Sequence, residues 1–141
     1  MKNLKLIIIN GPNLNLIGIR EPDVYGPTPF GSYLKKLRKE FPHVSFDYFQ
    51  SNVEGEIINS IQKAGLLYDG IILNAGGYAH TSIAIPDAIR AIKTPVVEVH
   101  ISNILAREEY RHLSLIAPHT KGVITGFGLD SYRLAVLSFH P

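Results

Sequence analysis

Two residues of a long segment rich in glycine and proline, Arg20 and Tyr25, are candidates for acid–base chemistry. Free tyrosine titrates near pH 10 and is a poor base at neutral pH, but neighbouring cations favour the phenolate. Arg20 precedes Tyr25 by five residues, and Arg107 can close over the same place from beyond the fourth predicted strand. Two close guanidinium groups could supply the roughly 3 kcal/mol that a two-unit shift requires. The alternative is a loop tyrosine that packs its ring on the protein body.

Glu98 and His100 form a second candidate pair at the end of an apolar run. Residues two apart on a strand point to the same side, so the carboxylate could orient the imidazole and fix its tautomer. His100 would then be a general acid. A structural carboxylate–imidazole pair is the alternative.

Further polar residues lie where other predicted strands end. Asn74 and His80 flank a tight loop and could bind hydroxyl groups, although Asn74 alone could also be a turn residue. Arg111 follows Arg107 by four residues, which predicts that both lie on one helix face. Arg111 could then pair with an acidic or hydroxylated ligand, or with Glu108.

Ile101 and Ser102 are predicted to open the helix after the fourth strand. Backbone N–H groups at a helix N-terminus bind anions such as a carboxylate or a phosphate. The alternative is that Ser102 only caps the helix.

Apolar runs alternate with helical patterns along the whole chain. The predicted strands are Lys5–Asn10, His43–Gln50, Gly70–Asn74, Pro95–Ile101 and Lys121–Gly126. The first predicted helix is capped by Thr28, has Pro29 at its first position and ends before Pro42, and the second runs from the Ser51-x-x-Glu54 capping box to a stop at Gly65. Pro86 indicates that the third helix begins near Ile85 or bends there. The last two predicted helices cover Ile104–Tyr110 and Leu129–Phe139.

This alternation predicts an α/β fold, a flavodoxin-like three-layer sandwich with a five-stranded parallel sheet of order 2-1-3-4-5 and helices on both faces. Ligands of such sheets bind outside the carboxyl ends of the strands. The candidate residues described above follow those ends, so we expect them to share one site.

The composition of the 141-residue chain predicts a single catalytic domain over residues 1–141. A net charge of +2, with no basic run longer than Lys35-Lys36, argues against nucleic acid as a partner. The absence of cysteine excludes disulfides and thiol chemistry. No apolar run reaches the ~20 residues of a membrane span, and no signal-peptide pattern is present, so a cytoplasmic protein is expected.

The sequence indicates neither a metal nor a cofactor. The histidines lack zinc spacing, and Gly76-Gly77 lacks both the dinucleotide fingerprint and the P-loop lysine. The lysines fall on helix faces or strand beginnings, away from the carboxyl edge, which argues against a Schiff base. A flavodoxin-like nucleotide- or flavin-binding module stays open as an alternative. A receiver domain would need an acidic cluster after the first strand, where the chain has Asn10-Gly11-Pro12.

Three long motifs carry a resemblance to a known family. They are G-P-N-L-N-L-I-G-I-R-E-P-D-V-Y-G (Gly11–Gly26), L-N-A-G-G-Y-A-H-T-S (Leu73–Ser82) and E-V-H-I-S-N-I-L-A-R-E-E-Y-R (Glu98–Arg111). In this order, and over essentially the whole chain, the sequence resembles type II 3-dehydroquinate dehydratase. The resemblance implies a hydro-lyase of the shikimate pathway of aromatic amino acid biosynthesis. Such an enzyme dehydrates 3-dehydroquinate by anti elimination through an enolate, without cofactor, metal or imine, and assembles trimers into a dodecamer.

The resemblance also implies roles for individual residues. Tyr25 matches the base, Arg20 the lid arginine that activates it, and Arg107 the second cation beside it. His100 matches the acid, with Glu98 behind it.

The remaining matches concern substrate binding. Asn13 matches a residue that holds a water at the developing enolate. Asn74, His80 and Arg111 match groups that bind the ring hydroxyls. Ile101 and Ser102 match the backbone site for the substrate carboxylate. Asp87 matches an acid supplied by a neighbouring subunit.

Overall fold

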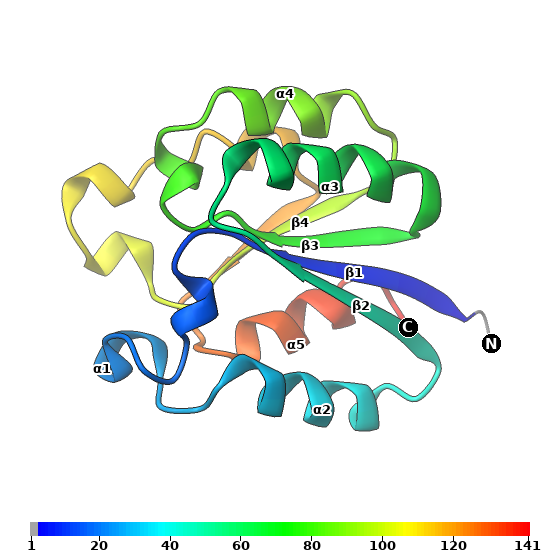
Figure 1. Ribbon diagram of the computed structural model, residues 1–141, viewed down its shortest axis with the longest axis horizontal. Coiled ribbons are helices and arrows are strands. Elements are labelled where there is room, and N and C mark those ends of the chain that lie inside the picture. The colour runs from blue at the N-terminus through cyan, green and yellow to red at the C-terminus, as the bar shows by residue number, and fades with distance from the viewer. Residues whose placement is uncertain (1–2) are drawn as a thin grey trace.

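The computed structural model describes residues 3–141 and has three layers, a central sheet between two pairs of helices (Figure 1). The strands are β1 (Leu4–Asn10), β2 (Val44–Gln50), β3 (Gly70–Asn74), β4 (Val96–His100) and β5 (Gly122–Thr125). They pair in parallel in the order β2-β1-β3-β4-β5. The predicted flavodoxin-like fold and strand order are therefore confirmed, with strand ends within one residue of the expected positions.

Helices and 3-10 turns connect the strands. The α-helices are α1 (Pro22–Tyr25), α2 (Phe30–Glu40), α3 (Glu54–Leu67), α4 (Ala84–Arg90) and α5 (Asp130–Leu137). The 3-10 turns are η1 (Leu14–Leu16), η2 (Gly76–His80), η3 (Ile104–Ala106), η4 (Glu109–Arg111) and η5 (Ala117–His119). The loop predicted between β1 and α2 thus contains a turn and a short helix.

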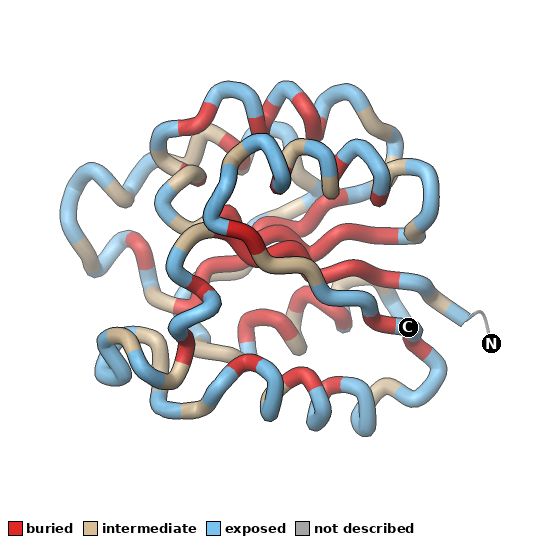
Figure 2. The backbone as a smooth tube through the Cα atoms, in the orientation of Figure 1, coloured by how far each residue is buried: buried red, intermediate tan, exposed pale blue. Residues whose placement is uncertain are grey.

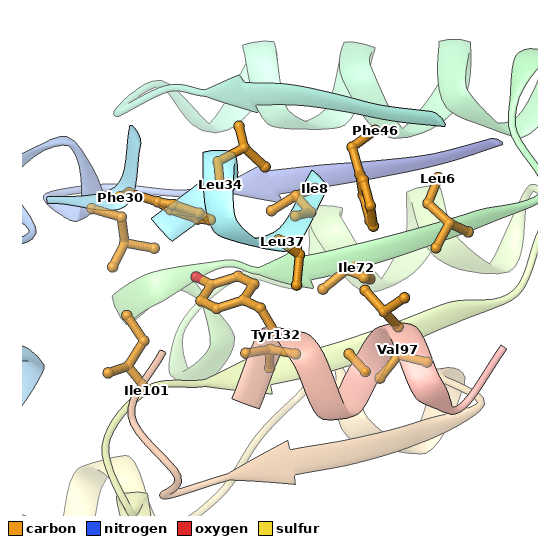
Figure 3. Packing of buried hydrophobic residues seen from close by; sticks show 14 of the residues in the cluster. Leu6, Ile8, Phe30, Leu34, Leu37, Phe46, Ile72, Val97, Ile101 and Tyr132 are labelled. Atoms are coloured by element: carbon orange, nitrogen blue, oxygen red, sulfur yellow. The ribbon is translucent and has the colours of Figure 1, made fainter. Parts of the chain in front are cut away.

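The inner strands are buried on both faces, as their continuous apolar runs predict (Figure 2). Alternate side chains of β1 enter two separate cores. Leu6 and Ile8 pack with α2 and α5, and Ile7 and Ile9 pack with α3 and α4. Figure 3 shows the first of these cores, in which Tyr132 of α5 lies below the sheet. This double burial holds the strand ends in place around the site.

The predicted beginning of α3 is wrong. Ser51 Oγ accepts a hydrogen bond from the Val53 N–H at 2.9 Å and donates to Glu56 rather than pairing with Glu54 in a capping box. α2 is also shifted by one residue, because Pro29 occupies the N-cap position expected for Thr28. Ser51 therefore bonds to residues two and five positions later, and not to the residue three positions later that the capping-box motif predicts.

Gly65 does not end α3, which continues to Leu67. A Cβ built on Gly65 would lie 2.5 Å from Ile92 Cγ2. Glycine is therefore required at this position by close packing against the segment that follows α4, and not by the geometry of a helix end.

The helix predicted over Ile104–Tyr110 is also wrong. Two 3-10 turns, η3 and η4, replace it, with Arg107 in an extended conformation between them. Asn103 caps η3 by accepting a hydrogen bond from the Leu105 N–H at 3.1 Å. Because the segment is broken, Arg107 and Arg111 do not share a helix face.

Two glycines of α3 give a matched pair of predictions. Gly65→Ala should destabilise the protein, because overpacking costs about 1–3 kcal/mol and outweighs a helix-propensity gain of up to about 1 kcal/mol. Gly55→Ala should stabilise it by about 0.5–1 kcal/mol, since nothing lies within 4 Å of a Cβ at that position. Urea unfolding of both variants measures the difference, and equal shifts would contradict the packing explanation.

Candidate active site

A cavity lies at the carboxyl ends of the strands, where α1 and the turns η3 and η4 come together at one end of the sheet (Figure 1). It is lined by Pro12, Asn13, Leu14, Arg20, Tyr25, Asn74, Gly76, Gly77, His80, His100, Ile101, Ser102, Ile104, Arg107 and Arg111. The topology therefore brings together residues that are far apart in the sequence.

The charged side chains that line the cavity are arginines. Arg20, Arg107 and Arg111 line it, and within residues 3–141 neither a carboxylate nor a lysine does so. Arg20 and Arg111 also pair with carboxylates outside the lining, those of Glu21 and Glu108. Lys2 lies outside the described residues. Three guanidinium groups without a lining acid favour a ligand that carries negative charge.

Tyr25 is the last residue of α1, and both predicted arginines contact it. Arg107 Nη1 donates a 2.9 Å hydrogen bond to the Tyr25 hydroxyl. The Arg20 Cζ lies 4.9 Å from the centre of the Tyr25 ring, and the Arg107 Cζ lies 5.5 Å from it. Arg107 therefore places a guanidinium group at the phenol oxygen, and Arg20 places a second one over the ring.

The Glu98 carboxylate is fully buried behind His100 and bonded to His100 Nε2. Both side chains point to the same side of β4, as predicted. The carboxylate accepts a hydrogen bond from Nε2, so this nitrogen carries a proton. Nδ1 is the ring nitrogen of His100 that Glu98 does not contact.

Ser114 holds Glu98 from the other side, a contact that the sequence analysis missed. The Ser114 Oγ accepts hydrogen bonds from the N–H groups of Ile116 at 3.2 Å and Ala117 at 3.1 Å. Its own proton is thereby directed to the Glu98 oxygens, at 2.7 and 3.0 Å. A serine shortly before an apolar turn indicates hydrogen bonding to the following backbone N–H groups. Nothing in the sequence indicates that Ser114 contacts Glu98.

His80 and Asn74 line the cavity with their orientations set by backbone groups. His80 Nδ1 contacts the Leu113 carbonyl at 2.8 Å, and its ring stacks on that of His100 at 6.0 Å. The carbonyl can only accept, so His80 Nδ1 carries the proton. Asn74 Oδ1 accepts a hydrogen bond from the Gly76 N–H at 3.1 Å.

Asn13 enters the cavity from the segment after β1. It adopts a left-handed conformation with φ of 69°, and its N–H donates to Asn52 Oδ1 at 2.9 Å. Gln50 Nε2 donates to the Gly11 carbonyl at 3.1 Å and to Asn52 Oδ1 at 3.3 Å. Gln50, the last residue of β2, and Asn52, two residues later, therefore anchor this loop, a role that the sequence alone did not predict.

Ile101 and Ser102 line the cavity, but they do not open a helix as predicted. Asn103 is the N-cap of the three-residue turn η3. Ser102 is held instead by side chains, because Thr125 Oγ1 donates to its carbonyl at 2.9 Å and Arg107 Nη1 donates to its hydroxyl at 3.3 Å. The macrodipole of a helix therefore contributes nothing here.

Arg111 and Asp87 have different positions relative to the cavity. Arg111 lines it and donates from Nε to Glu108 Oε2 at 2.6 Å. The pKa of the Glu108 carboxyl is lowered by a hydrogen bond from its own backbone N–H and by Arg111. Asp87 lies on α4 outside this cavity, with an exposed side chain 3.7 Å from Arg90.

The structure has an α/β fold with a candidate site at the strand ends, and comparisons with known proteins identify the family. The family described as "Dehydroquinase class II" matches residues 4–140. The chain is 52% identical over 140 residues to "3-dehydroquinate dehydratase" of Fusobacterium nucleatum, covering 95% of each chain. It is 50% identical over 139 residues to the protein of that name from Nitratiruptor sp., covering 97% of this chain and 89% of the relative.

Solved structures agree with this assignment. The type II dehydroquinase from Butyrivibrio crossotus superposes with a TM-score of 0.94 at 39% identity, covering 99% of both chains. The type II dehydroquinase from Propionibacterium acnes gives 0.92 at 34% identity, covering 98% of this chain and 97% of the other. This chain belongs to the class II dehydroquinase family and is an enzyme of that type. Membership of this family favours an enzyme over the alternative of a nucleotide- or flavin-binding module.

Over the part of the chain from residue 3 onward, no helix is both long and apolar enough to cross a membrane. Among the same residues, no group of three or more histidine or acidic side chains is arranged to hold a metal ion.

Ser114→Ala should lower the free energy of unfolding by about 1–3 kcal/mol, because it removes a partner of the buried Glu98 and the acceptor of two backbone N–H groups. Ser45→Ala, on the exposed side of β2, is the control and should change stability by less than about 0.5 kcal/mol. Urea unfolding monitored by circular dichroism measures both. Equal stability of the two variants would contradict the described network.

Proposed function

We propose that this chain dehydrates 3-dehydroquinate to 3-dehydroshikimate as a single catalytic domain. The observation that carries the proposal is the Tyr25 hydroxyl, bonded to Arg107, with Arg20 over its ring, in the same cavity as His100. Family membership and the names of the relatives support the substrate. The cationic lining suits a ring compound with a carboxylate.

The first step is removal of the proton next to the ketone by Tyr25. A base for this step must be ionised at neutral pH, and the two guanidinium groups stabilise the phenolate electrostatically. Asn13, at the edge of the cavity, holds a water near the developing enolate oxygen. Closure of the segment Gly11–Gly26 excludes bulk water and strengthens these interactions.

The second step is loss of the hydroxyl, to which His100 gives a proton. Glu98 stabilises the imidazolium through Nε2, so the proton leaves from Nδ1. A base and an acid on opposite faces of one ring give anti elimination through an enolate. No lysine from residue 3 onward lines the cavity, which supports a mechanism without a Schiff base.

The remaining lining groups hold the substrate. Asn74, His80 and Arg111 bind ring hydroxyls, and the backbone at Ile101 and Ser102 binds the carboxylate. Ser102 is well placed for this because Arg107 and Thr125 fix its position. Neither a metal nor a cofactor takes part in the proposed mechanism.

We further propose that the enzyme is cytoplasmic, serves the shikimate pathway, and assembles from trimers into a dodecamer. Asp87 then reaches the cavity of a neighbouring subunit. Two observations support this arrangement. Asp87 is exposed and outside its own cavity, and large apolar side chains at the start of α4 and on the neighbouring helix α3 are exposed, with Ile83 at 73% and Leu66 at 87%.

Tyr25→Phe should lower kcat by a factor of about 10²–10⁴, the contribution of a positioned base, while binding of substrate is retained. The assay mixes chelator-treated protein with 3-dehydroquinate and follows the ultraviolet absorbance of the conjugated enone. Tyr68→Phe is the matched control, because its hydroxyl is bonded to Asp47 away from this cavity, and it should keep wild-type turnover. Folded wild-type protein without an enone signal would refute the proposed activity.

Light scattering should give the mass of twelve copies of the 15.6-kDa chain. Asp87→Ala should raise KM in the assembled enzyme, because it deletes a group supplied across the interface. Arg90→Ala, which removes the ion-pair partner of Asp87 within the chain, is the control and should raise KM less. A monomeric and fully active enzyme would contradict the assembly.

A further inference from the structure

The hydroxyl of Tyr132 lies between two asparagines at the ends of neighbouring strands. Tyr132 is fully buried in the core between α5 and the sheet (Figure 3). Asn10 ends β1 and Asn74 ends β3, and the two are paired in register. Tyr132 Oη is 2.7 Å from Asn10 Oδ1 and 2.9 Å from Asn74 Nδ2. Only Asn74 of these three lines the cavity.

The direction of these hydrogen bonds is set by one backbone group. The Gly76 N–H can only donate, and it lies 3.1 Å from the Asn74 amide oxygen. The Asn74 amide nitrogen must therefore face Tyr132, whose hydroxyl accepts from it and donates to Asn10 Oδ1. Asn10 Nδ2 in turn donates to the Tyr48 hydroxyl at 3.3 Å.

This arrangement leaves Asn74 with one amide hydrogen beyond those already used. Its oxygen faces Gly76 and one hydrogen faces Tyr132. The second hydrogen of the amide therefore remains for the cavity. Asn74 thus presents a donor, which suits an oxygen acceptor of the ligand and disfavours a group at that position that can only donate.

We propose that Tyr132 is a positioning residue that fixes Asn74 as a hydrogen-bond donor toward the substrate. The inference deepens the proposed function, on which it rests, by assigning substrate recognition to a residue of the core. Asn74 touches the substrate, and Tyr132 acts through Asn74.

Two properties of Tyr132 suit it to this role. Burial raises the pKa of its phenol, so the hydroxyl stays neutral and both donates and accepts. Its ring is held by aromatic neighbours, with the Phe30 and Tyr33 ring centres 4.9 and 6.2 Å away. A phenylalanine at this position could fill the same space. The hydroxyl is therefore not needed for packing, and what it adds is the pair of hydrogen bonds to Asn10 and Asn74.

Tyr132→Phe tests the proposal by the separation of KM from kcat in the enone assay. Loss of the hydroxyl frees the Asn74 amide to rotate and weakens ground-state binding. We expect KM to rise roughly three- to tenfold, the size of one neutral hydrogen bond, with kcat within about twofold of wild type, the pattern of lost uniform binding.

Tyr33→Phe is the matched control. It removes a phenolic hydroxyl from the same aromatic cluster, where Tyr33 accepts a hydrogen bond from the Arg133 N–H at 3.1 Å, but it has no contact with Asn10 or Asn74 in the network described above. Thermal denaturation should show that both variants lose stability, whereas KM should rise in Tyr132→Phe alone.

A double-mutant cycle with Asn74→Ala tests whether Tyr132 acts through Asn74. Adding Tyr132→Phe to Asn74→Ala should leave KM at the value of Asn74→Ala alone. Additive effects in the double variant would overturn the inference, as would an unchanged KM in folded Tyr132→Phe. Absence of turnover in the wild type would instead refute the proposed function itself.

Should Tyr132→Phe not fold, Tyr48→Phe replaces it, because Tyr48 is partly exposed and ends the same chain of hydrogen bonds. Without that acceptor the Asn10 amide can turn its nitrogen toward Tyr132, so the Tyr132 proton loses its acceptor and the hydroxyl no longer holds Asn74 as firmly. A KM above that of Tyr33→Phe supports the inference, and a wild-type KM overturns it.

Discussion

Burial of polar side chains at the carboxyl ends of the inner strands is the constraint on which the site depends. Asn10, Asn74, Glu98 and His100 are all buried there, on strands whose other residues form two apolar cores. A buried polar group without a partner costs about 1–3 kcal/mol, and within residues 3–141 each buried side-chain polar atom has one. The partners therefore orient the groups before any ligand arrives.

Two networks meet this constraint on opposite faces of the sheet. On the face of α3 and α4, the backbone N–H groups after Ser114 direct its hydroxyl to Glu98, which holds His100. On the face of α5, Tyr132 joins Asn10 and Asn74. In both networks a backbone N–H, which can only donate, determines the direction of the bonds. Preorganisation of this kind avoids reorganisation during reaction.

The sequence predicted the features that follow from periodicity and from the positions of strand ends. Continuous apolar runs imply strands buried on both faces, so the sheet order and the shared location of Tyr25, Asn74 and His100 could be anticipated. Prediction from the sequence failed where a segment could form more than one kind of cap or turn. Ser51 bonds to Val53 and Glu56, and Asn103 bonds to Leu105, which are local alternatives to the predicted helix caps. The role of Gly65 depends on a tertiary contact with Ile92 that no local pattern records.

The sequence by itself determined which chemistry-bearing residues follow which strands, because alternation along a strand and the direction of a parallel sheet require only local information. The tertiary structure decided how each group is oriented. Arg107 meets Tyr25 from 82 residues away, and Tyr132 meets Asn10 from 122 residues away. Residues so far apart in the sequence come into contact only when the helices pack on the sheet. The rotamers and hydrogen-bond directions of the site follow from that packing.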